Sequence, residues 1–451
     1  MKGRAHLSTA PFSTLYSLWR HPHVHRERIL EFRNRRLRRI IHHAYHHVLY
    51  YRALFDRHGL KPEHIRTVED LSRIPMTSRA QLQALPEEHI VAKGVNARRL
   101  IWRDTSGSSG ISLRVRRTWL EERIHGMLRL RALHSQGLRI GDTHCYVVMP
   151  LGAHQRDHQL LQRIAAAMGF GRQIVVNCLL SPEEIVDRLE AIRPAAVTGY
   201  PVVLATIAQA IAKERLGALR LRFVGTGGEV LTSLMRQQIE EGFGAPVYDM
   251  YASHEFNLVA WQCRASGELH VCDDGVIIEV LNGDRPVEEG QNGEVVGTDL
   301  HSSAMPLIRY RLGDIVTKGG SICKCGQPFS TIRNVRGRMI DYFHLPDGRK
   351  VHPFQLWGAR REKTHWIRQY QVTQERLDHI VLRVVPWHMP SAGELAALRD
   401  PAVAFLGPRV HFEVMLVPEI RVEPNGKFRV FRSRVASHYD EAARSLLDTT
   451  S

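Results

Sequence analysis

Six short clusters of glycine, hydroxyl and charged residues could carry chemistry in this 451-residue chain. The first is a run of hydroxyl and glycine residues: Thr105, Ser106, Gly107, Ser108, Ser109 and Gly110. Hydroxyls and backbone N–H groups of such a loop can surround phosphate oxygens, because glycine lets the backbone approach closely. The run is not a Walker A loop, since no Lys-Ser/Thr pair follows its second glycine. Taken alone, a Ser/Gly cluster is more often an ordinary loop.

The other five clusters follow in order along the chain. They are Gly227-Gly228-Glu229, Tyr251-Ala252-Ser253-His254-Glu255, Tyr310-Arg311-Leu312-Gly313-Asp314, Gly337-Arg338 and Gly426-Lys427-Phe428-Arg429. Each is unspecific by itself, and Lys427 alone also fits an exposed hairpin turn. Together, their order and spacing resemble the acyl-adenylate-forming superfamily, and within it the phenylacetate-CoA ligase-like family with its capsular-polysaccharide-associated members. The opening segments HHAYHHVLYYRALFDRHGL and DLSRIPMTSRAQL also resemble that family, so the resemblance covers nearly the whole chain.

The resemblance implies a nucleotide site for ATP. Residues 105–110 would hold the phosphates, Gly228 and Glu229 would line the adenine, and Tyr251 would flank it, with Ser253 in the same segment. Asp314 matches an aspartate that accepts hydrogen bonds from both ribose hydroxyls.

The resemblance also implies three catalytic residues. Glu255 matches a glutamate that holds Mg²⁺, an ion that offsets phosphate charge while the substrate carboxylate attacks the α-phosphate. Arg338 matches an arginine at the domain junction, near the ribose and phosphate. Lys427 is the best single catalytic candidate, because its ammonium is a compact charge that can bridge carboxylate and phosphate oxygens.

Three positions bear on how far the family pattern applies. Relatives commonly have a glycine where this chain has Ala252, and Ser or Thr where it has His254. A histidine beside the metal-binding glutamate could alter the acyl pocket, so the identity of the acid substrate is not determined. Tyr200, His254 and Phe256 are candidates for the walls of that pocket. Asp341 matches the second of two acidic residues that relatives often carry at the junction, and we interpret it as a hinge.

A second kind of chemistry is suggested by clustered cysteines. Cys323 and Cys325 supply two thiolates from one tight turn, and Cys263 and His270 lie upstream, with Cys272 two residues after the histidine. In an extended strand His270 and Cys272 would face the same side, so either could complete a tetrahedral zinc site. Several members of the family that this chain resembles carry a Cys…His…Cys-x-Cys zinc site. The resemblance therefore favours His270 as the fourth ligand and implies a structural role for the zinc. Cys145 and Cys178 lie in apolar runs and are expected in the core.

The elements that must position these residues alternate between strand and helix patterns. Apolar runs at 144–150, 173–179, 195–201, 221–228 and 245–251 predict strands, and 157–168, 182–192 and 201–215 predict helices. The pattern indicates an α/β domain with a largely parallel sheet. Residues 267–335 are β-rich and predict a subdomain, and residues 28–58 predict one basic amphipathic helix. We expect an adenylate-forming domain over 1–337 and a small mobile α+β lid domain over 338–451.

Composition limits the setting in which this chemistry takes place. The net charge is +16, from 62 basic and 46 acidic residues, and we interpret it as a well-solvated arginine-rich surface. No nucleic-acid motif, membrane span or secretory signal is evident, so we expect a cytoplasmic protein.

These features predict a ligase that makes acyl-AMP and transfers the acyl group to coenzyme A. The substrate would be a small carboxylic acid, aryl or aliphatic. An amine, a carrier-protein thiol and a hydroxyl remain alternative acceptors, and a non-catalytic nucleotide-binding scaffold and a homodimer also remain open.

Overall fold

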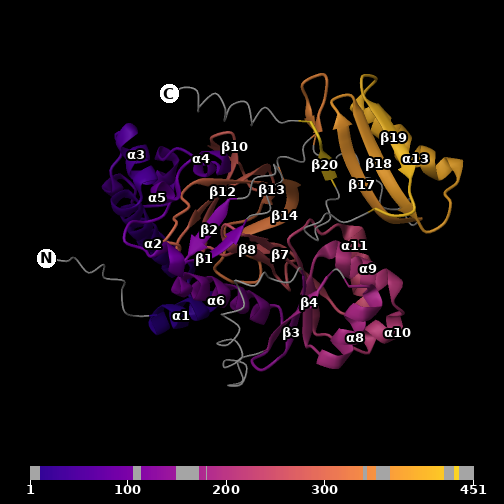
Figure 1. Cartoon of the computed structure of the whole chain (residues 1–451), viewed down its shortest axis with the longest axis horizontal. Coiled ribbons are helices and arrows are strands. Elements are labelled where there is room, and N and C mark those ends of the chain that lie inside the picture. The colour runs from indigo at the N-terminus through magenta and orange to yellow at the C-terminus, as the bar shows by residue number, and fades with distance from the viewer. Residues whose placement is uncertain are drawn as a thin grey trace.

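The computed structural model describes residues 11–104, 113–148, 172–178, 180–338, 343–351, 366–420 and 431–435. Its strands form one 12-stranded mixed sheet, one 4-stranded sheet and two 2-stranded ribbons, with helices packed around them (Figure 1). The predicted mixed α/β class is therefore confirmed. No helix in this described part of the chain is long and apolar enough to cross a bilayer.

One half of the large sheet is parallel. Its strands are β3 (His144–Val148), β4 (Gln173–Asn177), β5 (Ala196–Gly199), β6 (Phe223–Gly227) and β7 (Val247–Ser253), in the order β4-β3-β5-β6-β7. Every residue of β5 is buried, as expected for a parallel strand that is covered on both faces. Each strand begins within two residues of a predicted apolar run, which confirms this part of the prediction.

Four helices flank these strands (Figure 1). They are α8 (Pro182–Ile192), α9 (Pro201–Ala210), α10 (Lys213–Gly217) and α11 (Ser233–Phe243). The prediction for α8 is confirmed at both ends, because Ser181 caps its first turn and Arg193 ends it in a left-handed conformation. The single helix predicted over 201–215 is wrong: Ile211 and Ala212 have extended backbones and separate α9 from α10. The helix predicted over 157–168 lies outside the described residues.

The other half of the sheet is antiparallel. Its strands are β8 (Asn257–Gln262), β9 (Leu269–Val271), β10 (Val276–Asn282), β11 (Arg285–Pro286), β12 (Asn292–Asp299), β13 (Tyr310–Lys318) and β14 (Thr331–Arg338). These strands continue the parallel half, because β8 pairs with β7 through Met250 and Trp261. The predicted β-rich segment is confirmed, but it has no sheet of its own.

The N-terminal segment wraps one side of the large sheet (Figure 1). It contains α1 (Pro11–Arg20), α2 (Arg26–His47), α3 (Leu49–Arg57), α4 (Arg79–Gln83), α5 (Glu87–Ile90) and α6 (Trp119–Ser135), with 3-10 turns at His21–His23, Pro62–His64, Glu69–Arg73 and Ala97–Arg99. The single helix predicted over 28–58 is wrong, because Val48 has an extended backbone with φ −117° and ψ 117°. The break lets α3 turn back, and the Val48 side chain is buried.

The arginines are not only a solvated surface, which corrects the prediction from net charge. Arg117, Arg131 and Arg309 are almost fully buried. Arg131 donates to both carboxylate oxygens of Asp274, at 2.5 and 2.8 Å, and Arg309 grips Glu279 at 2.9 Å through two nitrogens. A planar guanidinium can be buried in this way because its charge and its donors are satisfied together.

A small α+β unit follows the large sheet. It contains the two-residue strands β15 (Phe343–His344) and β16 (Lys350–Val351), then β17 (Ile367–Arg376), β18 (His379–Pro386), α13 (Ala392–Leu406), β19 (His411–Leu416) and β20 (Phe431–Ser433). The last four strands form a sheet in the order β19-β18-β17-β20, which lies beside α9 and α11 (Figure 1). The Gln209 side chain on α9 donates to the Arg368 carbonyl on β17 at 3.3 Å.

Candidate active site and metal-ligand cluster

Two residues from separate predicted motifs meet in a buried hydrogen bond. The Tyr251 hydroxyl on β7 donates to Asp314 Oδ2 on β13 at 2.7 Å. Three strands, β8, β9 and β14, lie between them in the sheet order. In a flat sheet β7 and β13 would be about 19 Å apart, since neighbouring strands are separated by about 4.8 Å. The sheet must therefore curl strongly for the two side chains to touch.

Glu255 lies in the turn between β7 and β8 and is only 2% exposed. Its Oε1 accepts hydrogen bonds from Arg79 Nη2 at 3.0 Å and from the Tyr310 hydroxyl at 3.2 Å. Burial raises the pKa of the Tyr310 phenol, so this group is a donor at neutral pH. The carboxylate is thus oriented by one cation and one phenol.

The backbone of the same turn is also fixed. Arg117 Nη2 donates to the carbonyls of His254, at 3.3 Å, and of Glu255. Ser253 Oγ accepts a hydrogen bond from the Phe256 amide at 3.0 Å. Phe256, a predicted pocket residue, is fully buried, and its ring lies where a Cβ at Gly297 would collide with it. It supports the turn from the core side.

The Gly-Gly-Glu segment lies at the end of β6. Gly228 has a left-handed backbone with φ +81°, and a Cβ there would lie 3.1 Å from the Tyr200 ring. Both constraints, the left-handed backbone and the Tyr200 ring packed over the segment, favour glycine at this position. Glu229 follows at a half-buried position.

Several residues near the site were missed by sequence reasoning. Arg79 lies in the TSRAQL segment, and Thr77, two residues before it, pairs with Tyr310 as an isolated parallel bridge. Asp249 precedes Tyr251 by two residues on β7 and accepts a hydrogen bond from Thr226 Oγ1 at 2.8 Å. Burial raises the pKa of Asp249 to about 6. The period of two in a strand could have suggested Asp249, whereas nothing local pointed to the partners of Arg79.

Three predicted parts of the site are not described by the structure. Residues 105–110, Lys427 and Asp341 lie outside the described residues. The strands that flank the first segment are described: β1 (Ile101–Asp104) pairs with β2 (Arg114–Arg117) as an antiparallel ribbon. Of Arg338 only the backbone is described, and it lies opposite Asp314 in the β13–β14 pair.

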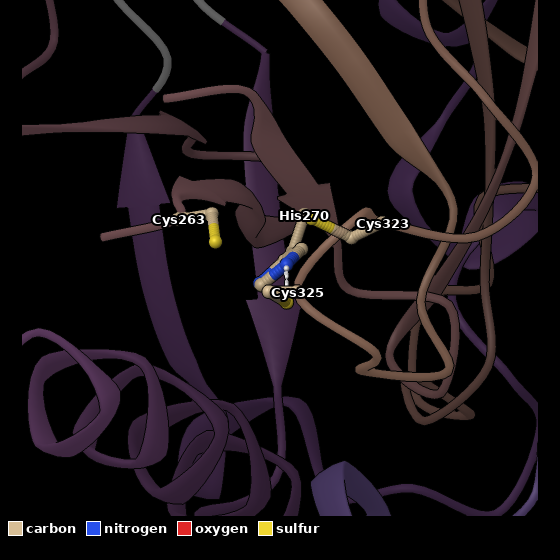
Figure 2. Close-up of side chains that lie close together, drawn as sticks. All are labelled: Cys263, His270, Cys323 and Cys325. Atoms are coloured by element: carbon tan, nitrogen blue, oxygen red, sulfur yellow. Dashed lines mark hydrogen bonds between the residues drawn. The ribbon is translucent and has the colours of Figure 1, made fainter. Parts of the chain in front are cut away.

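The predicted cysteine and histidine ligands come together. Ligand atoms of Cys263, His270, Cys323 and Cys325 all lie within 4.8 Å of one another, and the four side chains gather around a common space (Figure 2). Cys325 Sγ lies 3.3 Å from His270 Nε2. A tetrahedral zinc ion with bonds of about 2.1–2.3 Å would need ligand atoms about 3.5–3.8 Å apart. The arrangement therefore fits one four-coordinate ion.

The side chains have the chemical character of ligands as well as the spacing. Burial lowers the pKa of His270 to about 4, so the imidazole is neutral near pH 7, as a ligand must be. His270 Nδ1 is buried and has no hydrogen-bond partner among the residues that the structure describes. Backbone amides of Ala265 and Gln327 donate to the Cys263 and Cys325 sulfurs at 3.4 and 3.5 Å.

Cys272, the alternative fourth ligand, belongs to another cluster. It follows the end of β9, and its thiol lies 3.6 Å from Asp274 Oδ1 and 3.8 Å from Arg131 Nη2. The expected extended continuation of the strand past His270 is wrong, because β9 ends at Val271 and a turn begins. Cys145 and Cys178 are buried, as predicted.

Comparison with solved structures places this fold in a known class. A 2-hydroxyisobutyryl-CoA ligase in its postadenylation state aligns with a TM-score of 0.75, at 21% identity over 96% of this chain and 94% of that one. The same ligase in its thioesterification state aligns with a TM-score of 0.63. The chain thus shares its fold with this acyl-CoA ligase.

Curated proteins with similar sequences are mostly phenylacetate-coenzyme A ligases. A phenylacetate-coenzyme A ligase of Thermus thermophilus is 27% identical over 383 residues, which are 80% of this chain and 82% of the relative. Protein CapK of Staphylococcus aureus is 25% identical over 252 residues, 54% of each chain. No protein-family model matches the sequence. The chain is thus similar, at weak to moderate identity over most of its length, to phenylacetate-coenzyme A ligases, and over about half of its length to a CapK protein.

Proposed function

We propose that this chain is an adenylate-forming acid–CoA ligase. In the first step a carboxylate oxygen attacks the α-phosphorus of ATP, and the bond to pyrophosphate breaks. In the second step the coenzyme A thiol, losing its proton, attacks the acyl carbon of the acyl-AMP, and AMP leaves. The observation that carries the proposal is that Tyr251, Glu255 and Asp314, from two separate motifs, converge on the curled sheet.

Asp314 is the proposed ribose-binding residue. An ionised carboxylate is acceptor-only, so Asp314, which accepts the Tyr251 hydroxyl at 2.7 Å, is the kind of group that also accepts hydrogen bonds from ribose hydroxyls. Gly228 and Glu229 would border the adenine, with Ser253 and Arg338 near the nucleotide. The loop 105–110 would surround the phosphates.

Glu255 is the proposed magnesium ligand. Among the described residues, both of its side-chain hydrogen bonds go to Oε1. Oε2 is therefore the oxygen that would hold the ion, while Arg79 and Tyr310 fix the carboxylate. Bound Mg²⁺ would neutralise phosphate charge during attack.

A small C-terminal unit over 338–451 is the proposed lid. It would present Lys427 for adenylate formation and a different face for thioester formation, with Asp341 as the hinge. The two states of the similar ligase, which align to different extents, support this proposal. The Cys/His cluster would hold a structural zinc, because four protein ligands leave no open position.

The substrate class follows from the relatives rather than from the site geometry. Phenylacetate is the first acid to test, because it names the sequence relatives. His254 next to Glu255 makes other aryl or aliphatic acids worth including.

ATP–pyrophosphate exchange with a panel of aryl and aliphatic acids tests the adenylation step. We expect acid-dependent exchange with at least one arylacetic acid, followed by thioester formation when coenzyme A is added. Measurable ATP binding without exchange for any acid would support a non-catalytic scaffold instead. Exchange without thioester would point to a carrier-protein thiol or an amine as the acceptor.

A further inference from the structure

Two histidines and a glutamate cluster on the small sheet, in elements that contribute nothing to the sites described above. His379 begins β18, and His411 and Glu413 lie on β19. The two strands are parallel, with His379 opposite His411 and Val381 opposite Glu413. Since side chains alternate along a strand, His411 and Glu413 share one face. The register therefore places all three side chains together at the edge of the sheet.

The geometry is close to that of a coordinated ion. His379 Nε2 lies 3.1 Å from Glu413 Oε2, and the His379 and His411 ring centroids are 5.1 Å apart. One ligand atom from each residue lies within 4.8 Å of the other two. Bonds of about 2.0–2.2 Å to a tetrahedral ion require separations of about 3.3–3.6 Å. His411 is exposed, so its ring can turn through the remaining distance.

A simple ion pair explains only part of this arrangement. It accounts for His379 and Glu413, but not for a second imidazole at the same place. Two nearby arginines have acidic partners of their own: Arg376 lies 3.6 Å from Asp378, and Arg383 donates to Glu375 at 2.8 Å. A cation at the cluster would therefore meet a carboxylate with two nitrogen donors.

We propose that His379, His411 and Glu413 form a second metal site that binds a borderline divalent cation such as Zn²⁺ or Co²⁺. Two imidazoles and one carboxylate suit these ions, whereas Mg²⁺ and Ca²⁺ prefer all-oxygen sites. Three protein ligands leave at least one position for water. The ion joins the edge strand β19 to β18, so its binding stabilises the native small sheet.

Cobalt titration of the full-length protein tests the site, after the Cys/His cluster has been filled with one equivalent of zinc. Zinc has a filled d shell and is silent in the visible spectrum, so added Co²⁺ reports other sites. We expect one equivalent to bind with d–d absorption, no thiolate-to-cobalt band, and a higher melting temperature. Thiolate bands in the wild type would show that Co²⁺ enters the cysteine cluster instead, and would contradict the proposal.

Two variants and one control complete the test, because the chain has 26 histidines and the experiment must separate this cluster from the other imidazoles. His411→Ala should weaken Co²⁺ binding by at least about tenfold, since even outer-shell changes cost 10–100-fold, and should abolish the thermal shift. His388→Ala, another exposed histidine of the same unit, should change neither. His411→Cys should create a thiolate-to-cobalt band. Unchanged binding by His411→Ala, or no new band in His411→Cys, would overturn the proposal.

Discussion

Three carboxylates have different partners, and these partners separate their roles: Asp249 lies on β7, Glu255 follows β7, and Asp314 lies on β13. Asp314 receives the Tyr251 phenol, Glu255 is held by Arg79, and Asp249 receives the Thr226 hydroxyl. Of these, only Asp249 lacks a role in the proposed chemistry. The first two can be tested by ligand binding, and the third by stability.

Asp314→Ala tests the placement of the ribose. Hydrogen bonds to charged groups contribute roughly 1.5–3 kcal/mol each, and water replaces part of that loss. The variant should therefore raise the ATP dissociation constant by at least about tenfold, equivalent to ~1.4 kcal/mol. Calorimetric titrations with ATP and 2′-deoxy-ATP measure the effect, and the variant should lose the preference for ATP.

Tyr251→Phe is the matched control for Asp314→Ala. It removes the buried phenol hydroxyl but keeps the carboxylate, so the preference for ATP over 2′-deoxy-ATP should survive. If wild type and Asp314→Ala discriminate equally between the two nucleotides, the ribose does not bind at Asp314. Asp314 would then serve only the local turn.

Asp249→Asn tests the effect of a buried carboxyl on stability. Burial raises the pKa of Asp249 to about 6, against a usual value of 3.8. Between these values the folded state binds more protons than the unfolded state, so this group lowers stability as pH rises through that window. The free energy of unfolding of the variant minus that of the wild type should therefore rise from pH 4 to 6 and stay constant above pH 6.

Urea unfolding of both proteins across this pH range measures that difference. Thr226→Val is a useful companion variant, because it removes the hydrogen bond to the Asp249 carboxylate. In this variant the free energy of unfolding should fall more between pH 4 and 6 than it does in the wild type. A variant-minus-wild-type difference that does not change with pH would show that Asp249 titrates alike in both states.

At the element scale, the curl of the large sheet and the cysteine cluster both connect segments distant in sequence. The curl brings the Tyr251 side chain of β7 into contact with the Asp314 side chain of β13. The cluster ties the β8–β9 connection to the turn between β13 and β14, through Cys263 and the Cys323–Cys325 pair. A metal there would fix the antiparallel half of the sheet without touching the nucleotide.

The purified protein should contain about one zinc per chain in the Cys/His cluster. Replacing Cys323 and Cys325 by serine should then lower the melting temperature by at least about 4 °C, or ~1–2 kcal/mol for a domain of this size. Pyrophosphate exchange measured at low temperature should fall much less. Cys325 is exposed, so its removal would cost little without a metal.

Lys324→Ala is the control, since it changes an exposed residue of the same turn without removing a ligand. It should retain both zinc and the wild-type melting temperature. Elemental analysis that finds no zinc in protein purified without chelators would remove the metal from the proposal, whatever the stability of the variants.

At the scale of the whole molecule, the small unit lies beside α9 and α11, and its last described strand is β20 (Figure 1). Lys427 precedes that strand in a segment outside the described residues. The proposed two-step reaction needs this lysine only for adenylate formation, when the lid presents it to the nucleotide.

Lys427→Ala should separate the two steps. Loss of a charge that stabilises a transition state typically costs about 10²–10³ in rate, so pyrophosphate exchange should fall by about that factor. The variant should still convert synthetic acyl-AMP and coenzyme A to thioester, as followed by chromatography. Arg429→Ala, which removes a positive charge two residues away, is the control and should keep pyrophosphate exchange near the wild-type rate. Unchanged exchange in Lys427→Ala would exclude its role in adenylation.

The sequence alone was sufficient for those features that depend on neighbours along the chain. Apolar runs at residues 144–251 predicted the five parallel strands, and the helical pattern over 182–192 predicted α8. Such signals are local, because side-chain periodicity and capping involve residues within a few positions. The ordered motifs likewise indicated the family without any contact being known.

Tertiary structure decided the features that depend on distant partners. Tyr251 and Asp314 are 63 positions apart, and Arg79 and Glu255 are 176 apart. His270, rather than Cys272, faces the other cysteines because the chain turns after Val271 and buries the Cys272 thiol beside Asp274. Local sequence patterns do not predict how a sheet curls or which carboxylate an arginine side chain will contact, because both depend on packing between remote segments.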